Sequence, residues 1–299
     1  MQDAKELFLL DCRSRSLSPE TLIVNRRVLD QFFDHCKATA LADITAVHIK
    51  QYLTQKAEAN SKSTARRYYT ALKSFFKFAV DEGLIKANPM ERVTTPKEPT
   101  PIIKPLTSDQ LSAIVKEANG KTFVDVRNRL ILLLLIDCGL RCSELIHLEV
   151  EDIDLDNGLL TVNHGKGDRA RSCPIGSVTA KALRQYLIRR GTPNTSTLII
   201  NTLGEPTRRE NVLHIVQAAG KKAGVPRAYP HLLRHSMAVE FLRNGGNAFA
   251  IQRILGHSTL TMTKRYCELA DSDVVNQHRL YSPCDNLKTS ERTGRKRLR

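Results

Sequence analysis

Four side chains in this sequence have the types and the order needed to break a phosphodiester bond. Arg141 and Arg234 can each hold a phosphate through two parallel hydrogen bonds, and together they can offset the charge that grows on it during attack. Tyr266 offers a hydroxyl nucleophile, and Lys166 can protonate the departing oxygen. We therefore expect a covalent phosphotyrosine and release of a 5′ hydroxyl.

Two histidines complete the constellation. His231 precedes Arg234 by three positions, so on one helix the two share a face, and His231 can bond the same phosphate or take the proton of the attacking hydroxyl. His257 lies between this pair and Tyr266. Because no acidic cluster suits a magnesium ion, we expect strand transfer without a metal or nucleotide cofactor.

The same residues allow two other interpretations. His231 and His235 are four apart and could, with His257, bind zinc, but the positive charge of Arg234 between them disfavours a metal. Tyr281 is a rival nucleophile that lies farther from His257 than Tyr266 does. We therefore expect no metal site.

The bulk composition favours a nucleic-acid partner. The chain has 299 residues and a formal net charge of +15, which suits a polyanion because each neutralised phosphate releases counterions. Its seven cysteines are odd in number and scattered, as expected in a reducing cytoplasm. The longest apolar run, residues 130–136, is far shorter than the roughly 20 residues that span a bilayer. We expect a cytoplasmic protein with this run in a buried helix.

Residues 1–95 have the pattern of a four-helix bundle. Ser18 followed by Pro19 predicts the start of a helix over 19–37, Thr45 can begin a short helix, and a longer one is expected over 65–81. In the longer helix an apolar stripe is separated from a basic face, which suits DNA, although a solvated surface has the same pattern. The candidate DNA-binding residues on that face are Arg66, Arg67, Lys73 and Lys77.

The rest of the chain has a different pattern. A stretch with five prolines over residues 88–105 predicts an extended connection, with the linker itself at 96–105. The second domain, 106–285, should begin with a helix near Ser108 and a strongly apolar helical stretch broken at Gly139, so that Arg141 lies where the next helix starts. Residues 153–175 alternate with period two around two turns, which predicts a three-stranded antiparallel meander with Lys166 at the second tip. Further helices are expected over 178–189, 208–223, 231–243, 247–255 and 259–270, followed by a disordered basic tail, 286–299.

The strings GLRCSEL, HGKGDRAR, HLLRH and LGH, followed by Tyr266, resemble the motifs of the tyrosine recombinase (phage integrase) family in its compact form, similar to Xer recombinases and mobile-element integrases. The resemblance covers almost the whole chain. It implies supporting roles for Glu144 and His235 beside Arg141. The basic residues Arg169 and Arg171, which follow Lys166, are further candidates for DNA binding. The catalytic positions that it implies are Arg141, Lys166, His231, Arg234, His257 and Tyr266.

The same resemblance implies the fold and the reaction. The fold would be mainly α with a small β-meander, with a helical, SAM-like core-binding domain before an α+β catalytic domain. The reaction would be site-specific recombination through a 3′-phosphotyrosyl linkage and a Holliday junction, by a homo-tetramer on paired sites in double-stranded DNA. A related recombinase or an accessory protein could take part, in mobile-element movement or in dimer resolution. Two alternatives stay open, namely a type IB topoisomerase-like relaxation of DNA and a noncatalytic DNA-binding protein.

Overall fold

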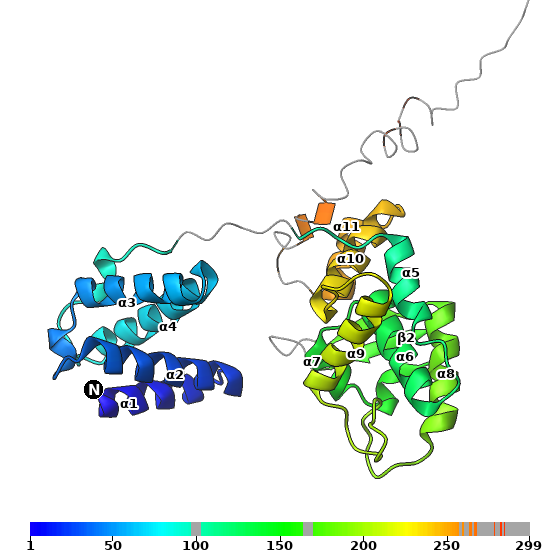
Figure 1. Ribbon diagram of the computed structural model, residues 1–299, viewed down its shortest axis with the longest axis horizontal. Coiled ribbons are helices and arrows are strands. Elements are labelled where there is room, and N and C mark those ends of the chain that lie inside the picture. The colour runs from blue at the N-terminus through cyan, green and yellow to red at the C-terminus, as the bar shows by residue number, and fades with distance from the viewer. Residues whose placement is uncertain are drawn as a thin grey trace, which may run out of the picture. The chain divides into compact units, whose positions relative to one another are not determined.

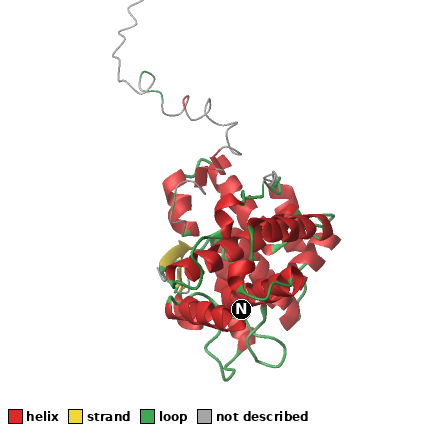
Figure 2. Cartoon of the chain, turned by 90° about the vertical axis from the view of Figure 1, so that its left-hand side faces the viewer, coloured by secondary structure: helices red, strands yellow, loops and turns green. Residues whose placement is uncertain are grey.

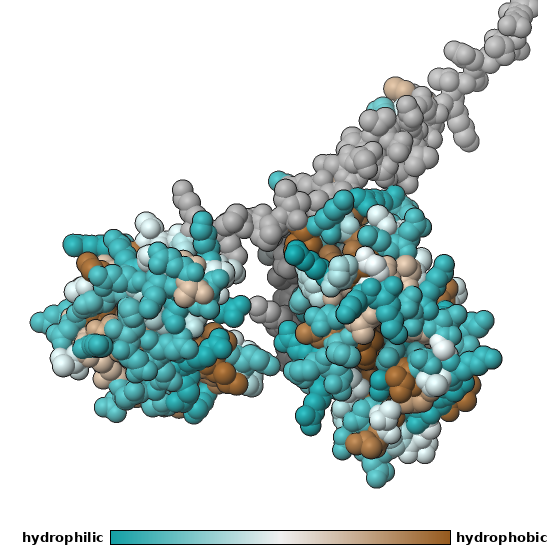
Figure 3. All heavy atoms as spheres, in the orientation of Figure 1, coloured by the Kyte–Doolittle hydropathy of each residue, from teal (hydrophilic) through white to brown (hydrophobic). Residues whose placement is uncertain are grey.

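The computed structural model describes residues 1–96, 103–163 and 170–256, and beyond these Thr259, Thr263, Lys264, Tyr266, Cys267, His278, Ser282 and Cys284. The chain divides into two compact units, Met1–Ile102 and Ile103–Arg299 (Figure 1). On the face drawn in Figure 3, both units are mainly hydrophilic, with scattered apolar patches. Within the described residues, no helix is long and apolar enough to cross a membrane.

The first unit is a bundle of four helices. They are α1 (Gln2–Ser14), α2 (Pro19–Cys36), α3 (Ala46–Ala59) and α4 (Lys62–Asp81). The hydroxyl of Ser18 accepts a hydrogen bond from the backbone N–H of Thr21, so α2 begins at the predicted cap. Edge-to-face aromatic contacts at the centre join α1, α2 and α4. The ring centroids of Phe8 and Phe75 are 5.5 Å apart, and those of Phe32 and Phe76 are 6.1 Å apart.

The expected two faces of α4 are present. The apolar stripe is buried, and Leu72, Phe76 and Ala79 are fully inaccessible. Arg66, Arg67, Lys73 and Lys77 are all exposed. The basic face is therefore accessible to a ligand.

The first part of the proline-rich stretch is folded and not extended, so the connection starts later in the sequence than the composition suggested. Pro89–Arg92 forms a 3₁₀ helix, and the Asn88 side chain accepts a hydrogen bond from the N–H of Met90 at 2.9 Å. Met90 and Val93 are buried in the core of the helical bundle. The prediction of an extended chain from residue 88 was wrong here, because two apolar side chains three positions apart fold this segment onto the bundle.

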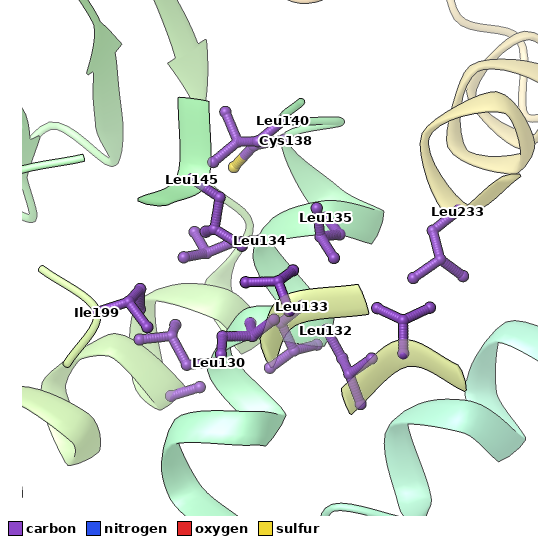
Figure 4. Close-up of a cluster of buried hydrophobic side chains, with 14 of the residues drawn as sticks. Leu130, Leu132, Leu133, Leu134, Leu135, Cys138, Leu140, Leu145, Ile199 and Leu233 are labelled. Carbon is purple, nitrogen blue, oxygen red and sulfur yellow. The ribbon is translucent and has the colours of Figure 1, made fainter. Parts of the chain in front are cut away.

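The second unit is built around one buried helix. Its helices are α5 (Ser108–Lys116), α6 (Phe123–Asp137), α7 (Cys142–His147), α8 (Ser177–Arg190), α9 (Arg209–Lys222), α10 (Pro230–Arg243) and α11 (Ala248–Leu255). The run from Leu130 to Leu135 on α6 is buried on all sides, as predicted (Figure 4). A helix that is apolar all round must be covered by neighbours, and α5, α7, α8, α9 and α10 pack against it.

A small antiparallel sheet lies in the same unit (Figure 2). Its strands are β1 (Ile153–Asp154), β2 (Leu159–Val162) and β3 (Arg171–Pro174), in the order β1-β2-β3. Leu160 faces Cys173 and Val162 faces Arg171 across β2 and β3. The mainly helical fold with one meander was predicted correctly. The predicted tip of the β2–β3 hairpin, with Lys166, lies outside the described residues.

Candidate active site

The site is organised around a buried carboxylate, Glu144, in the first turn of α7. α6 ends at Asp137, Gly139 follows its cap with a φ of +58°, and Arg141 is the residue directly before α7. The backbone N–H of Arg141 donates to Glu144 Oε2 at 2.6 Å, and its Nη1 donates to Oε1 at 2.7 Å. Because the Arg141 side chain is 25% exposed and the described protein groups bond only Nη1, other donors of its guanidinium can reach a ligand.

Arg171 holds the other side of the same carboxylate. Its Nη1 and Nη2 donate to Glu144 Oε1 and Oε2, both at 2.7 Å, and its Nε donates to the carbonyl of Ile254 at 2.8 Å. The side chain is only 9% exposed. This does not fit the DNA contact expected for Arg171, because all three guanidinium nitrogens bond to protein.

These contacts set the protonation of Glu144. Burial alone would raise its pKa, but hydrogen bonds from Arg171 and from Arg141 outweigh burial and bring the pKa to about 2. Glu144 is therefore an anion at any physiological pH. A buried anion of this kind can keep several cations close together.

Arg234 lies on α10 beside this cluster. Its Nη2 donates to the carbonyl of Leu255 at 2.7 Å, its Nη1 donates to the carbonyl of Gly139, and Nη1 is 3.8 Å from Glu144 Oε2. Burial and the charge of Arg141 lower the pKa of Arg234 to about 10, so it stays a cation at neutral pH. Arg141 and Arg234 therefore lie beside the same carboxylate.

The two histidines of α10 lie at the edges of the cluster. His231 is exposed, and partial burial together with the charges of Arg234, Arg141 and Arg209 lowers its pKa. One nitrogen of the His235 ring, Nε2, is 3.0 Å from the carbonyl of Ile103, and burial lowers the pKa of this histidine too. Both imidazoles are thus neutral at pH 7.

Tyr266 lies in a helical segment next to α10. Its ring is 5.2 Å from the ring of His235, centroid to centroid, at an angle of 52°. It packs against the small apolar cluster of Met237, Ala238, Leu242, Ile251 and Leu255, and its phenol interacts electrostatically with Arg234. The candidate nucleophile therefore lies against α10, next to His235 and within electrostatic reach of Arg234.

Several predicted site residues lie outside the described part of the chain: Lys166, Arg169, His257 and the rival Tyr281. The described residues bring together Arg141, Glu144, His231, Arg234, His235 and Tyr266. Sequence reasoning missed the place of Arg171 in this cluster. Alternation along β3 held the signal, because Arg171 is two positions before the buried Cys173 and so shares its face.

Comparison with known proteins decides the family. The phage integrase family profile matches residues 104–273, and the phage integrase N-terminal SAM-like domain matches residues 6–83. The chain belongs to the phage integrase family of tyrosine recombinases. It is a tyrosine-type site-specific recombinase, with the SAM-like domain in its helical bundle and the catalytic fold in its second unit.

Particular relatives support this assignment. Tyrosine recombinase XerC of Pelobacter propionicus is 34% identical over 263 residues, covering 86% of this chain and 87% of the relative. The fold resembles XerH recombinase bound to its palindromic difH substrate, with a TM-score of 0.74, 20% identity, and coverage of 91% and 82% of the two chains. It also resembles a lambda integrase tetramer bound to a Holliday junction, with a TM-score of 0.72, 22% identity, and coverage of 87% and 78%.

Proposed function

We propose that this recombinase cuts one DNA strand by attack of the Tyr266 hydroxyl on a phosphodiester and rejoins it by the reverse reaction. The Tyr266 oxygen forms a bond to phosphorus while the bond from phosphorus to the 5′ oxygen breaks, leaving a 3′-phosphotyrosyl ester. Lys166 gives its proton to the departing 5′ oxygen. The ester conserves the bond energy, so religation needs no nucleotide.

The observation that carries this proposal is the convergence of Arg141 and Arg234 on Glu144 beside Tyr266. Two arginines, held in place before the substrate arrives, offset the charge that develops on the nonbridging oxygens. Among the described residues Arg141 is bonded through one guanidinium nitrogen, and its side chain is 25% exposed, which suits direct contact with the phosphate. A neutral His231 suits acceptance of the hydroxyl proton, and His257 would bond the same phosphate.

The proposal extends to the DNA and to the assembly. The exposed basic face of α4 would bind the duplex backbone through Arg66, Arg67, Lys73 and Lys77, with Arg169 adding a contact from the catalytic domain. Four copies of the chain would pair two DNA sites in the cytoplasm and exchange strands through a Holliday junction, with residues 96–105 joining the two domains. The solved lambda integrase tetramer on a Holliday junction, whose fold this chain shares, supports that arrangement. The setting would be mobile-element movement or Xer-like dimer resolution.

Covalent trapping tests the chemistry and finds the DNA site together. The native chain and Tyr266→Phe would be incubated with nicked suicide duplexes carrying random cores, and the DNA linked to protein would be sequenced. We expect adducts only with the native chain and enrichment of one sequence. Adducts without sequence preference would favour relaxation of DNA, and binding without adducts would contradict the proposal.

A further inference from the structure

We propose that Arg171 is a positioning residue, which saturates Glu144 and thereby leaves Arg141 available to the scissile phosphate. The inference rests on the proposed function. It assigns to β3 a part in the chemistry that does not depend on contact with DNA.

The two oxygens of a carboxylate offer about four lone-pair sites for hydrogen bonds. Arg171 fills one site on each oxygen of Glu144, at 2.7 Å. Arg141 fills one more on each, through its backbone N–H at 2.6 Å and its Nη1 at 2.7 Å. Arg234 Nη1 stays at 3.8 Å from Oε2, beyond hydrogen-bond distance.

This occupancy explains why Arg141 can lie beside an anion and still bind another anion. Without Arg171, two acceptor sites on the buried Glu144 would be open. Arg141 already donates to this carboxylate, so the unsatisfied oxygens would draw the Arg141 guanidinium further toward Glu144 and away from a phosphate. The phosphate would then lose the charge compensation that its transition state requires.

Arg171 also fixes where the carboxylate lies. Its Nε donates to the carbonyl of Ile254, and Cys173 Sγ, on the same face of β3, donates to that carbonyl at 3.3 Å. The backbone passes so close that a Cβ added at Gly256 would lie 2.9 Å from Arg171 Cδ. Strand β3, the end of α11 and the start of α7 are therefore joined through one guanidinium group.

Lysine cannot replace this group. A guanidinium presents a planar fork that matches both carboxylate oxygens while its Nε bonds a third acceptor, whereas an ammonium is a point charge. Arg171→Lys therefore keeps the charge and most of the aliphatic side chain but loses at least one of the hydrogen bonds to Glu144. Arg190→Lys is the matched control, because the Arg190 guanidinium also bonds protein carbonyls, those of Thr195, Thr197 and Leu198, outside the Glu144 cluster.

The experiment measures single-turnover adduct formation on the duplex identified by trapping, at saturating protein. We expect Arg171→Lys to lower the cleavage rate constant by roughly 10- to 100-fold, the loss typical of misplaced catalytic groups, with the Kd for DNA and its salt dependence unchanged. A scissile methylphosphonate, which is neutral, needs less charge compensation and should restore the Arg171→Lys rate to within about threefold of native, since the defect is in the placement of Arg141. A 5′-bridging sulfur, which is a better leaving group, should not restore it.

Three results would overturn the inference while the native chain still forms its adduct. The first is a cleavage rate constant of Arg171→Lys equal to that of the native chain. The second is an equal loss of rate on the phosphate and methylphosphonate substrates. The third is weaker DNA binding by Arg171→Lys with a salt slope reduced by about one, which is the sign of a direct phosphate contact. Arg171→Gln, compared at a temperature where its circular dichroism equals that of the native chain, gives the same test should the lysine variant be unstable. A native chain that forms no adduct would reject the proposed function, and this inference with it.

Discussion

The backbone amide and the guanidinium of Arg141 both donate to the carboxylate of Glu144, at 2.6 and 2.7 Å. One glutamate therefore fixes both the start of α7 and the direction of the arginine side chain. Because Glu144 is almost completely buried, this relationship links folding stability to the geometry of the site.

The lowered pKa of Glu144 predicts a loss of stability in acid. Its folded pKa of about 2 lies below its ordinary value of 4.5, so the stabilisation is complete above about pH 5 and is lost as the pH falls toward 2. We expect a contribution of about 3 kcal/mol from this shift. Urea unfolding followed by circular dichroism should give the native chain a larger free energy of unfolding than Glu144→Gln at pH 6. The difference between the two proteins should shrink toward pH 3. A difference in free energy of unfolding that did not change with pH would contradict the ion-pair explanation.

Gly139 should tolerate no side chain. A Cβ there would lie 2.7 Å from Leu255 Cδ2, the backbone has a φ of +58°, and the Gly139 carbonyl accepts a hydrogen bond from Arg234. Gly139→Ala should therefore cost roughly 2–4 kcal/mol from strain and overpacking and should also slow cleavage. Gly224 also has a positive φ, of +73°, but a Cβ added there has no atom within 4 Å. Gly224→Ala should therefore lower the free energy of unfolding by only about 1 kcal/mol and leave cleavage normal. Equal losses of stability in the two variants would refute the close contact.

The lowered pKa of His231 predicts the pH dependence of cleavage. Partial burial and the nearby arginines hold its pKa below the ordinary 6.5, so the ring is a neutral acceptor at pH 7. The single-turnover rate constant should stay constant from pH 8 to 6.5 and fall at lower pH as the ring gains a proton. His231→Gln should be slower and should lose this acid limb of the profile. The same limb in both proteins would assign it to another group.

The basic face of α4 predicts a change in the salt dependence of DNA binding. Removing one side chain that neutralises a phosphate should reduce the slope of log K against log salt by about one. Binding of the native chain, Arg67→Ala and Lys73→Ala would be measured from 50 to 300 mM salt. Arg13→Ala, an exposed arginine of α1, removes the same charge and should leave the slope unchanged. Equal slopes in all four proteins would mean that this face is only solvated.

Much of the fold could be predicted from local pattern. The Ser18 and Pro19 pair set the start of α2, and period-two alternation set the meander, since caps and periodicity are local signals. The 3₁₀ helix at Pro89–Arg92 escaped prediction because its stability comes from burial of Met90 and Val93 against distant helices.

The sequence predicted which residues belong to the site but not which hydrogen bonds they make with one another. Arg141, Arg234 and Tyr266 stand out by type and spacing. The role of Arg171 depends on a contact with Glu144, 27 positions earlier, and on the carbonyl of Ile254, 83 positions later. A basic residue in a basic hairpin looks like a DNA contact until the fold shows which way it points.

Mass spectrometry of the trapped adduct tests the central claim most directly. After nuclease digestion of the linked DNA, trypsin separates Tyr266 from Tyr281 because it cleaves after Arg279. We expect the residual nucleotide on Tyr266 alone, through a 3′ phosphate, and no adduct in Tyr266→Phe. A nucleotide on Tyr281, or an adduct that persists in the Tyr266→Phe variant, would contradict this account of the reaction.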